Sequence, residues 1–480
     1  MQEKPNEPAA CQFNFEKLLP GLKEKAELLK GAGVKTIDEL FVDIPAKVRI
    51  DSLDLPEGLV EGELSTMMKK LLGANKTSRD TLSFLGAGMY PNYVPAVVRA
   101  VTSRGEFVTS YTPYQAEVSQ GMLQALWEFQ SLMCELTGME VTNTSMYDGP
   151  TAIGEAALMA ARSTKRKEIL VPKAMHWEKK EVLRTYTLGP GLAIKEVPYE
   201  PATGQLDLAV LKAMVNENTA ALVVSNPNFF GVWEESATGL KAMLGDAMLI
   251  VDANPISLGI AKAPGDYGAD IVVGEGQPLG VGPTLGGPSF GILTTRKKFL
   301  RDMPGRLIGM TKDAEGARAF CMTLQTREQH IRRGKATSNI CTNQGLLASA
   351  ATLHMALLGP QGLQKVALAC HANTRALLEQ VTAIPGVVRL HSEPYFHEAV
   401  IALDVPAQEV LRALRAQGIV GGVDVSRWYP ELGDAILVCA TETRTPEDLR
   451  RYAEHLERIV GRRNQGPACN KLKPSATSKW

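Results

Sequence analysis

The segment Met248-Leu-Ile-Val-Asp252-Ala-Asn254 is a run of apolar and β-branched residues that ends in an acidic residue. Such a run predicts a buried strand of a parallel sheet, with the carboxylate at the carboxyl end of the strand. Four similar runs are separated from it by helical stretches, at residues 169–171, 221–224, 271–273 and 290–293. This alternation predicts an α/β fold with a large, mostly parallel sheet covered by helices on both faces.

The pattern changes after about residue 300. Thr445-Pro446-Glu447-Asp448 is typical of a helix start, with a Thr cap, proline in the first turn and two acids. Before it, the sequence predicts two long helices and two strands, at 336–357, 361–383, 399–403 and 435–439. We therefore predict a large α/β domain over residues 86–305, followed by long helices and a small C-terminal α/β domain over 306–463.

The two ends of the chain differ from this core. Helical stretches before residue 85 are broken at Pro45, Pro56 and Gly58, which predicts an N-terminal helical arm over 1–85 that packs on something else. Apolar residues spaced three or four apart over 115–136, followed by Gly138, predict an amphipathic helix. Residues 464–480 have no periodicity, so we predict a disordered tail.

Composition narrows the classes of function. The 480 residues carry 52 basic and 52 acidic side chains, so the net charge is zero and no nucleic-acid footprint is present. The polar start and the lack of any apolar run near the ~18 residues of a membrane helix favour a cytoplasmic protein without a membrane span. Seven cysteines, none in a CxxC pair, predict neither disulfides nor structural zinc, and the histidines show no metal-ligand spacing.

Asp252 is the first candidate for chemistry. A carboxylate at the end of a buried strand suits the protonated ring nitrogen of pyridoxal phosphate (PLP). The alternative is that Asp252 caps the turn that begins at Asn254-Pro255. The sequence leaves both readings open.

Two further segments could approach a phosphate. Ser145-Met-Tyr-Asp148-Gly149-Pro-Thr151 precedes an Ala-rich helix whose backbone N–H groups could bind an anion, although the charge of Asp148 opposes this and a plain capped helix is as good a reading. The loop 280–288 contains Gly286 and Gly287, which permit close approach of a ligand, but hairpin turns use the same residues.

The most informative feature is a missing lysine. PLP enzymes anchor the cofactor as a Schiff base on a lysine presented one strand after the acid that holds the ring nitrogen. Residues 263–296 contain no lysine, and Gln277-Pro278 stands where one is expected. Lys262 follows too soon after Asp252, and Lys297 lies beyond the next strand, so the predicted cleft lacks its covalent anchor.

Two polar clusters are candidates for a shared pocket. Tyr111-Thr-Pro-Tyr114-Gln115 offers rings and hydroxyl groups for a small ligand, or else a core tyrosine pair. The segment 324–339 mixes cationic groups with hydroxyl and amide donors, as a loop facing a phosphate or a partner would, although a solvated charged face would look the same.

Seven short motifs are distributed along most of the chain, namely Phe84-Leu-Gly-Ala-Gly88, Tyr93-Val-Pro-Ala-Val97, Tyr111-Thr-Pro-Tyr-Gln115, Glu117-Val-Ser-Gln-Gly121, Met146-Tyr-Asp-Gly149, Met303-Pro-Gly-Arg306 and Gln325-Thr-Arg-Glu-Gln-His-Ile-Arg-Arg333. With these motifs the sequence resembles the glycine dehydrogenase (decarboxylating) P-protein family of the glycine cleavage system. The resemblance extends from about residue 15 to 460, and the length fits subunit 1, the N-terminal half of the two-chain form.

This resemblance implies a fold-type-I PLP enzyme. In that family glycine condenses with PLP, CO2 leaves, and the aminomethyl group passes to lipoamide on the H-protein; in two-chain members the PLP lysine belongs to subunit 2. We therefore expect an obligate partnership in which subunit 2 binds PLP covalently and this chain shapes the partner's active site. The expected shared-pocket residues are Tyr111, Tyr114, Gln115, Arg327, Lys335 and Thr337. The expected vestigial cleft comprises Asp252, Gln277, Pro278, Gly286 and Gly287.

Two other readings compete with a subunit of glycine decarboxylase. One is a self-sufficient PLP enzyme, such as an aminotransferase or desulfurase, that uses Lys262 or Lys297. The other is an interaction scaffold with an empty cleft.

Overall fold

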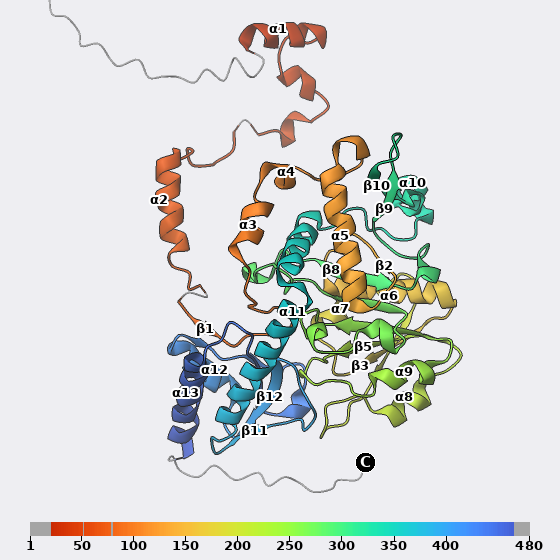
Figure 1. Cartoon of the computed structure of the whole chain (residues 1–480). Helices are drawn as coiled ribbons and strands as arrows, with labels where there is room; N and C mark the ends of the chain where they lie inside the picture. Colours follow the sequence, from red (N-terminus) through yellow and green to blue (C-terminus); the bar gives the residue numbers. More distant parts are fainter. Residues whose placement is uncertain (1–20, 51, 78–79, 465–480) are drawn as a thin grey trace, which may run out of the picture. The chain divides into compact units, whose positions relative to one another are not determined.

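The computed structural model describes residues 21–50, 52–77 and 80–464, and the chain divides into two compact units after Asn75. The segment predicted as a disordered tail lies outside the described residues, except for Asn464 at the end of the last helix. Figure 1 shows the order of the elements along the chain.

The first unit consists of short helices joined by extended segments. These are α1 (Leu22–Gly31), η2 (Asp38–Phe41), η3 (Ala46–Val48) and α2 (Glu61–Leu72). No side chain described in residues 21–75 is buried, and large apolar side chains such as Phe41, Val48 and Leu55 are exposed. This part therefore has no core of its own, and its packing on another surface stays a prediction.

A seven-stranded sheet forms the centre of the second unit, in the order β2-β8-β7-β6-β5-β3-β4. Its strands are β2 (Val141–Thr142), β3 (Glu168–Pro172), β4 (Ala193–Val197), β5 (Thr219–Asn226), β6 (Met248–Ala253), β7 (Ile271–Glu275) and β8 (Gly291–Thr295). The five neighbouring strands β4, β3, β5, β6 and β7 are parallel to one another, whereas β8 runs antiparallel to its neighbours β7 and β2. The predicted α/β fold with a mostly parallel sheet is confirmed.

Both faces of this sheet are buried under helices. Ile250 of β6 packs in one core with side chains of α6 (Gly149–Thr164) and α7 (Trp177–Leu188), whereas Leu249 and Val251 pack with α8 (Leu208–Met214) and α9 (Ala237–Leu244). Successive residues of a strand point to opposite faces. A strand buried on both faces therefore needs the uninterrupted apolar run by which the sequence predicted it.

Two long helices, α5 (Gln120–Thr137) and α11 (Gly345–Val381), lie side by side (Figure 1). Helix α5 starts later than predicted because residues 116–118 form a 3-10 turn, and it ends at Gly138, whose φ is 67°. The two helices predicted from 336 form one element that begins at Gly345 and is interrupted at Gly359, next to Pro360. Proline cannot continue the hydrogen-bond ladder, which explains the break.

A hairpin follows the large sheet, formed by β9 (Leu307–Lys312) and β10 (Arg318–Thr323). Its side chains Ile308 and Phe320 share a core with Leu123 and Phe129 of α5. Residues 307–323, which we assigned to the C-terminal domain, therefore pack on a helix of the large domain. The hairpin leads into η9 (Gln325–Arg327), α10 (Gln329–Arg332) and η10 (Arg333–Lys335).

The C-terminal part contains an antiparallel sheet in the order β11-β12-β15-β14. Its strands are β11 (Val387–Arg389), β12 (Glu398–Leu403), β14 (Val423–Asp424) and β15 (Ala435–Cys439), and its helices are α12 (Ala407–Ala416) and α13 (Pro446–Asn464). Strand β1 (Leu82–Ser83) pairs in parallel with β13 (Ile419–Val420). Residues 82–83, which we placed in the N-terminal arm, thus belong with the C-terminal elements.

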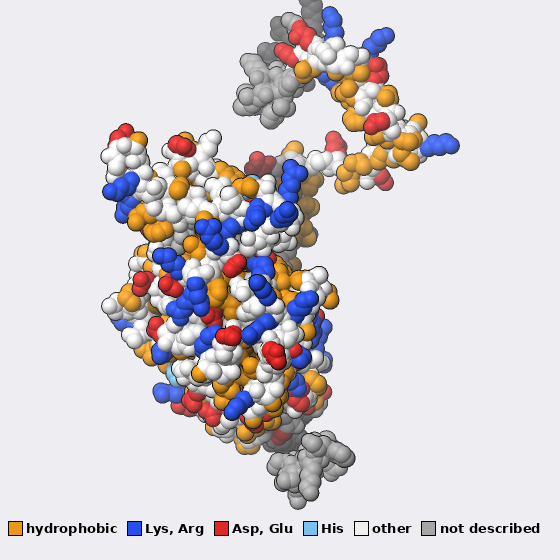
Figure 2. Space-filling view, turned by 90° about the vertical axis from the view of Figure 1, so that its right-hand side faces the viewer, with side chains coloured by type: hydrophobic (Ala, Val, Ile, Leu, Met, Phe, Trp, Pro, Cys, Tyr) orange, Lys and Arg blue, Asp and Glu red, His pale blue; other side chains and the backbone are white. Residues whose placement is uncertain are grey.

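The surface carries both signs of charge. Figure 2 shows Lys and Arg side chains interspersed with Asp and Glu over the visible face. In the described part of the chain no helix is long and apolar enough to cross a membrane, and no three His, Cys, Asp or Glu side chains are grouped to hold a metal ion. The cysteines that the structure describes are free, namely Cys134, Cys321, Cys341, Cys370 and Cys439.

Candidate functional site

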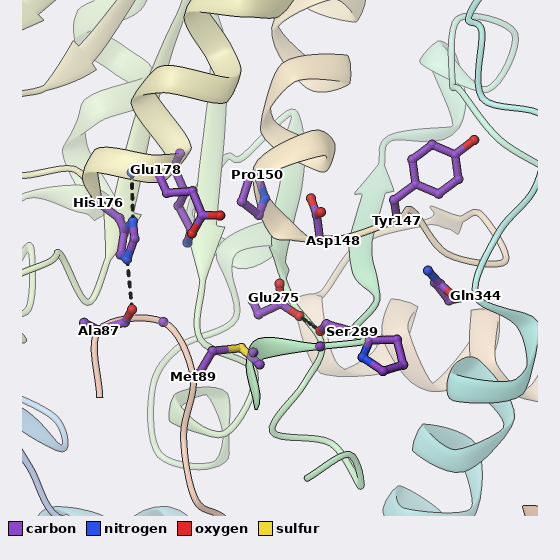
Figure 3. Close-up of a pocket in the computed structure, with 15 residues that line it drawn as sticks. Ala87, Met89, Tyr147, Asp148, Pro150, His176, Glu178, Glu275, Ser289 and Gln344 are labelled. Carbon is purple, nitrogen blue, oxygen red and sulfur yellow. Dashed lines mark hydrogen bonds between the residues drawn. The ribbon is translucent and has the colours of Figure 1, made fainter. Parts of the chain in front are cut away.

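A cavity of about 340 Å³ opens beside the carboxyl end of β7 and the first turn of α6 (Figure 3). A second cavity of about 50 Å³ adjoins it at the ends of β5 and β6. Gly88, His176 and Lys179 line both, and Gly286 and Gly287 line only the larger. We call these two cavities together the cleft; it lies at the strand ends where ligands of open α/β sheets bind.

Asp252 forms the floor of the smaller cavity. Its side chain is 4% exposed, and both carboxylate oxygens accept hydrogen bonds from Lys179 Nζ, at 2.9 and 2.7 Å. Ser225, its neighbour on β5, donates a third hydrogen bond at 2.8 Å. The following turn is capped by Asn254, which accepts from the Ile256 N–H. Asp252 therefore lies in the cleft, where it forms an ion pair with a lysine; its role toward a ring nitrogen stays a prediction.

His176 closes one wall of the cleft as a neutral ring. Its Nδ1 accepts from the Glu178 N–H at 3.1 Å, so the proton lies on Nε2, which is 2.9 Å from the Ala87 carbonyl oxygen. Burial, and then the charge of Lys179, lower the pKa of His176 to about 4. At neutral pH the ring adds no charge to the cleft.

The first turn of α6 is capped by side chains of this chain. The Gly149 N–H donates to the Glu275 carboxylate at 3.0 Å, and the Thr151 N–H donates to Asp148 Oδ1 at 2.8 Å. Ser289 also donates to Glu275 (Figure 3). Burial raises the pKa of the Glu275 carboxyl group, and these hydrogen bonds partly offset that rise. The sequence allowed an anion-binding or a capped helix start for this segment, and in the structure the helix start is capped.

Gln277 and Pro278 are turned into the core, away from the cleft. Gln277 is fully buried; it accepts from the Tyr90 N–H at 2.8 Å and donates to the carbonyl oxygens of Tyr90 and Val281. Among the described residues Lys179 is the one lysine that lines either cavity. Lys262 and Lys297 are both exposed.

A second cluster surrounds Arg306, which is buried. Its guanidinium group donates to the Tyr114 hydroxyl at 3.0 Å and to the Thr112 hydroxyl at 3.3 Å, and it lies 5.3 Å from the centre of the Tyr114 ring. The Glu328 carboxylate is 3.9 Å from its Nε atom. This arrangement joins the two polar segments that the sequence had marked separately. We call it the Arg306 cluster.

Of the six predicted shared-pocket residues, Tyr114 contacts Arg306 directly, whereas the other five lie on the two segments that the Arg306 cluster joins. Tyr111 is 80% exposed, and Gln115 and Lys335 are also exposed. The Thr337 N–H donates to the Arg327 carbonyl oxygen. The Arg327 guanidinium group donates to three backbone carbonyl oxygens, those of Met303, Gly305 and Leu324. Arg327 therefore holds the loop in place with all three nitrogen atoms of its guanidinium group.

The Arg306 cluster adjoins the cleft through two residues before α11. Asn343 accepts from Arg306 at 3.5 Å and donates to the Thr144 carbonyl oxygen at 3.0 Å. The next residue, Gln344, donates its N–H to the Ser145 hydroxyl at 3.0 Å and lines the larger cavity. The start of α11 thus connects the two sites.

Sequence reasoning missed Lys179 and Arg306. Lys179 lies three residues after His176 in the first turn of α7, and its partner Asp252 is 73 residues away in the sequence. No local pattern connects them. Arg306 ends the motif Met303-Pro-Gly-Arg306, which carried part of the family resemblance, so that motif was the available signal.

The mostly parallel sheet, the smaller C-terminal α/β part and the cleft at the strand ends define the class of fold-type-I PLP-dependent enzymes. A sphingosine-1-phosphate lyase structure from Burkholderia pseudomallei K96243 shares this fold, with a TM-score of 0.61 and 16% identity over 87% of this chain and 94% of that chain. The profile of the glycine cleavage system P-protein family matches residues 16–456. The chain belongs to that family.

Members of this family are similar over nearly the whole chain. A protein of Nitrosomonas europaea named "Probable glycine dehydrogenase (decarboxylating) subunit 1" is 49% identical over 446 residues, which are 91% of this chain and 97% of that protein. A crystal structure of glycine decarboxylase (P-protein) of the glycine cleavage system, in inhibitor-bound form, aligns with a TM-score of 0.85 and 41% identity over 92% of this chain and 99% of that chain.

Proposed function

We propose that this chain is subunit 1 of a two-subunit glycine decarboxylase. The complex decarboxylates glycine by means of PLP, releases CO2 and passes the aminomethyl group to the lipoamide of the H-protein. Family membership and the high coverage of relatives named subunit 1 support this assignment. The partner is subunit 2, the complex works in the cytoplasm, and nucleic acid and membrane take no part.

The assignment of the PLP-anchoring lysine to subunit 2 rests on one observation, namely that no lysine stands at the carboxyl end of β7 in this chain. The side chain that stands there, Gln277, is buried and hydrogen-bonded to backbone, and Pro278 has no amine. An imine to the cofactor needs a primary amine. The covalent anchor for PLP is therefore supplied by subunit 2.

This chain contributes the Arg306 cluster to the partner's active site. Tyr114 is half exposed and offers a hydroxyl group whose orientation is held by a buried guanidinium group. Tyr111, Gln115, Lys335 and Thr337 lie on the same two segments, and Arg327 fixes the loop that carries the last two. Preorganised donors and cations of this kind bind and orient an anionic substrate or cofactor group in the neighbouring chain.

The test is glycine-dependent exchange of CO2, with H-protein and PLP supplied. It is run with this chain alone, with subunit 2 alone and with the mixture. Activity in the mixture only is the expected result. Activity from this chain alone would contradict the proposal, because the chain would then hold a functional anchoring lysine.

Substitutions in the intact complex separate an active-site role from that of a pure scaffold. Tyr114→Phe and Lys335→Ala are each expected to lower the exchange rate about tenfold or more while the subunits remain associated, since each removes a group that orients the reacting partner. Tyr93→Phe and Lys365→Ala change exposed residues outside the Arg306 cluster and serve as matched controls. Unchanged rates for both test variants would favour the scaffold.

A further inference from the structure

PLP makes two demands on a fold-type-I cleft besides the lysine. Its protonated ring nitrogen needs a free carboxylate, and its anionic phosphate needs unpaired N–H donors, which a helix N-terminus supplies. Both places exist in this chain, at Asp252 and at the first turn of α6. Each can be tested for groups that remain free to bind the cofactor.

The place for the ring nitrogen is already taken. Lys179 Nζ bonds both oxygens of Asp252, and the Ser225 hydroxyl bonds one of them. A second cation at this carboxylate would meet the ammonium group within a few ångströms, which is unfavourable in a buried site. Lys179 would also be a poor anchor, because its amine is held as an ammonium group by both oxygens of Asp252.

The place for the phosphate is taken as well. In the first turn of α6 the Gly149 N–H is bound by Glu275, Pro150 has no N–H, the Thr151 N–H is bound by Asp148 Oδ1, and the Ala152 N–H is bound by the Asp148 carbonyl oxygen. No donor of this turn is left over. The two carboxylates that stand there would repel an incoming phosphate.

We infer that this chain excludes PLP because its own side chains stand in for the cofactor, Lys179 for the protonated ring nitrogen and Glu275 with Asp148 for the phosphate. This goes beyond the proposed function, which requires only that the covalent anchor belong to subunit 2. The cleft thus lacks the anchoring lysine, and its carboxylate and N–H donors for the cofactor are already bound by side chains of this chain.

The first test measures noncovalent binding to the full-length chain. The probe is pyridoxamine 5′-phosphate, which has the ring nitrogen and the phosphate but no aldehyde to react with surface lysines. Equilibrium dialysis is expected to show no saturable binding up to millimolar probe, and the reconstituted complex is expected to retain one PLP per pair of subunits. Saturable binding of one probe molecule to this chain, or two PLP per pair, would overturn the inference.

The second test removes the stand-in groups. The variant with Lys179→Ala, Asp148→Ser and Glu275→Ser removes the ammonium group from Asp252 and both carboxylates from the first turn of α6, while the serine at 148 keeps a neutral cap that a phosphate can displace. It is expected to bind the probe at least tenfold more tightly than the unmodified chain. Lys180→Ala, on the same helix but paired with Glu196, is the control that should gain nothing. A triple variant with native circular dichroism and no gain would refute the assignment to these side chains.

If the triple variant does not fold, the binding of pyridoxamine 5′-phosphate to the unmodified chain still tests whether this chain excludes the cofactor. The inference and the proposed function also fail separately. A mixture active in CO2 exchange whose subunit 1 binds the probe would refute the inference alone, and an inactive mixture with no binding by this chain would refute the proposed function alone.

Discussion

Glu398 is a fully buried carboxyl group at the first residue of β12, beside the smaller cavity of the cleft. It accepts from the Ala87 N–H at 2.6 Å and from the Tyr90 hydroxyl at 2.8 Å. Burial raises its pKa to about 7, and these hydrogen bonds and the charge of Lys179 oppose the rise. Between about pH 4.5 and pH 7 the folded chain therefore holds a proton here that the unfolded chain has lost.

This difference has a definite sign. The contribution of Glu398 to the free energy of unfolding is fully present below about pH 4.5 and declines by about 3 kcal/mol as the pH rises from there to about 7. In Glu398→Gln the amide oxygen accepts from the Ala87 N–H, the amide nitrogen donates to the Tyr90 hydroxyl, which becomes the acceptor, and the titration is removed. Its urea midpoint, relative to the unmodified chain, is expected to be higher at pH 8 than at pH 5. Parallel pH profiles for the two proteins would contradict this prediction.

Lys179 also has a measurable structural role. Lys179→Met leaves the Asp252 carboxylate buried without a cation, which is expected to lower the free energy of unfolding by about 3–5 kcal/mol. Lys180→Met breaks a longer ion pair with the more exposed Glu196 and is expected to cost less than about 1 kcal/mol. Thermal unfolding of both variants gives the comparison.

As a control, adding Asp252→Asn to Lys179→Met should recover part of the lost stability, because it removes the unpaired buried charge. Equal losses of stability in Lys179→Met and Lys180→Met would contradict a stabilising role of the Lys179–Asp252 ion pair.

At the scale of elements, the contact between α6 and α7 depends on a glycine. A Cβ atom built at Gly154 would lie 2.6 Å from the ring of Tyr186, so Gly154→Ala must displace that ring or the helix. The expected loss of stability is about 1–3 kcal/mol. At Gly239 in α9 no atom lies within 4 Å of an added Cβ, so Gly239→Ala is expected to stabilise by up to about 1 kcal/mol through helix propensity. Calorimetry of both variants tests the opposite signs.

The elements also show what local pattern can and cannot predict. The strand at 248–251 was predictable because its two buried faces require apolar side chains at every position. The late start of α11 was not, because residues 343–344 give their hydrogen bonds to Thr144 and Ser145 instead of to a helix. The pairing of β1 with β13 joins two-residue strands from opposite ends of the chain, and such short strands carry no pattern of their own.

At the scale of the whole molecule, the assembled enzyme should carry its cofactor on one subunit only. Borohydride reduction of the reconstituted complex, followed by peptide mass spectrometry, is expected to find stoichiometric pyridoxyl-lysine in subunit 2. In this chain the label should be substoichiometric and spread over exposed lysines, because Lys262 and Lys297 lie outside the cleft and Lys179 is paired with Asp252. A stoichiometric label at any one lysine of this chain would instead support the self-sufficient PLP enzyme.

Local patterns in the sequence are enough to predict the class of fold and to show that no lysine stands in residues 263–296. Both depend on local properties, namely apolar runs that only a doubly covered sheet requires and the absence of an amine from residues 263–296. The partners of Asp252 and of the first turn of α6 follow from the tertiary fold alone. Lys179 meets Asp252 across 73 residues and Glu275 meets Gly149 across 126, because the sheet brings separate strand and helix ends to one edge. Chain folding creates that proximity, and sequence spacing does not record it.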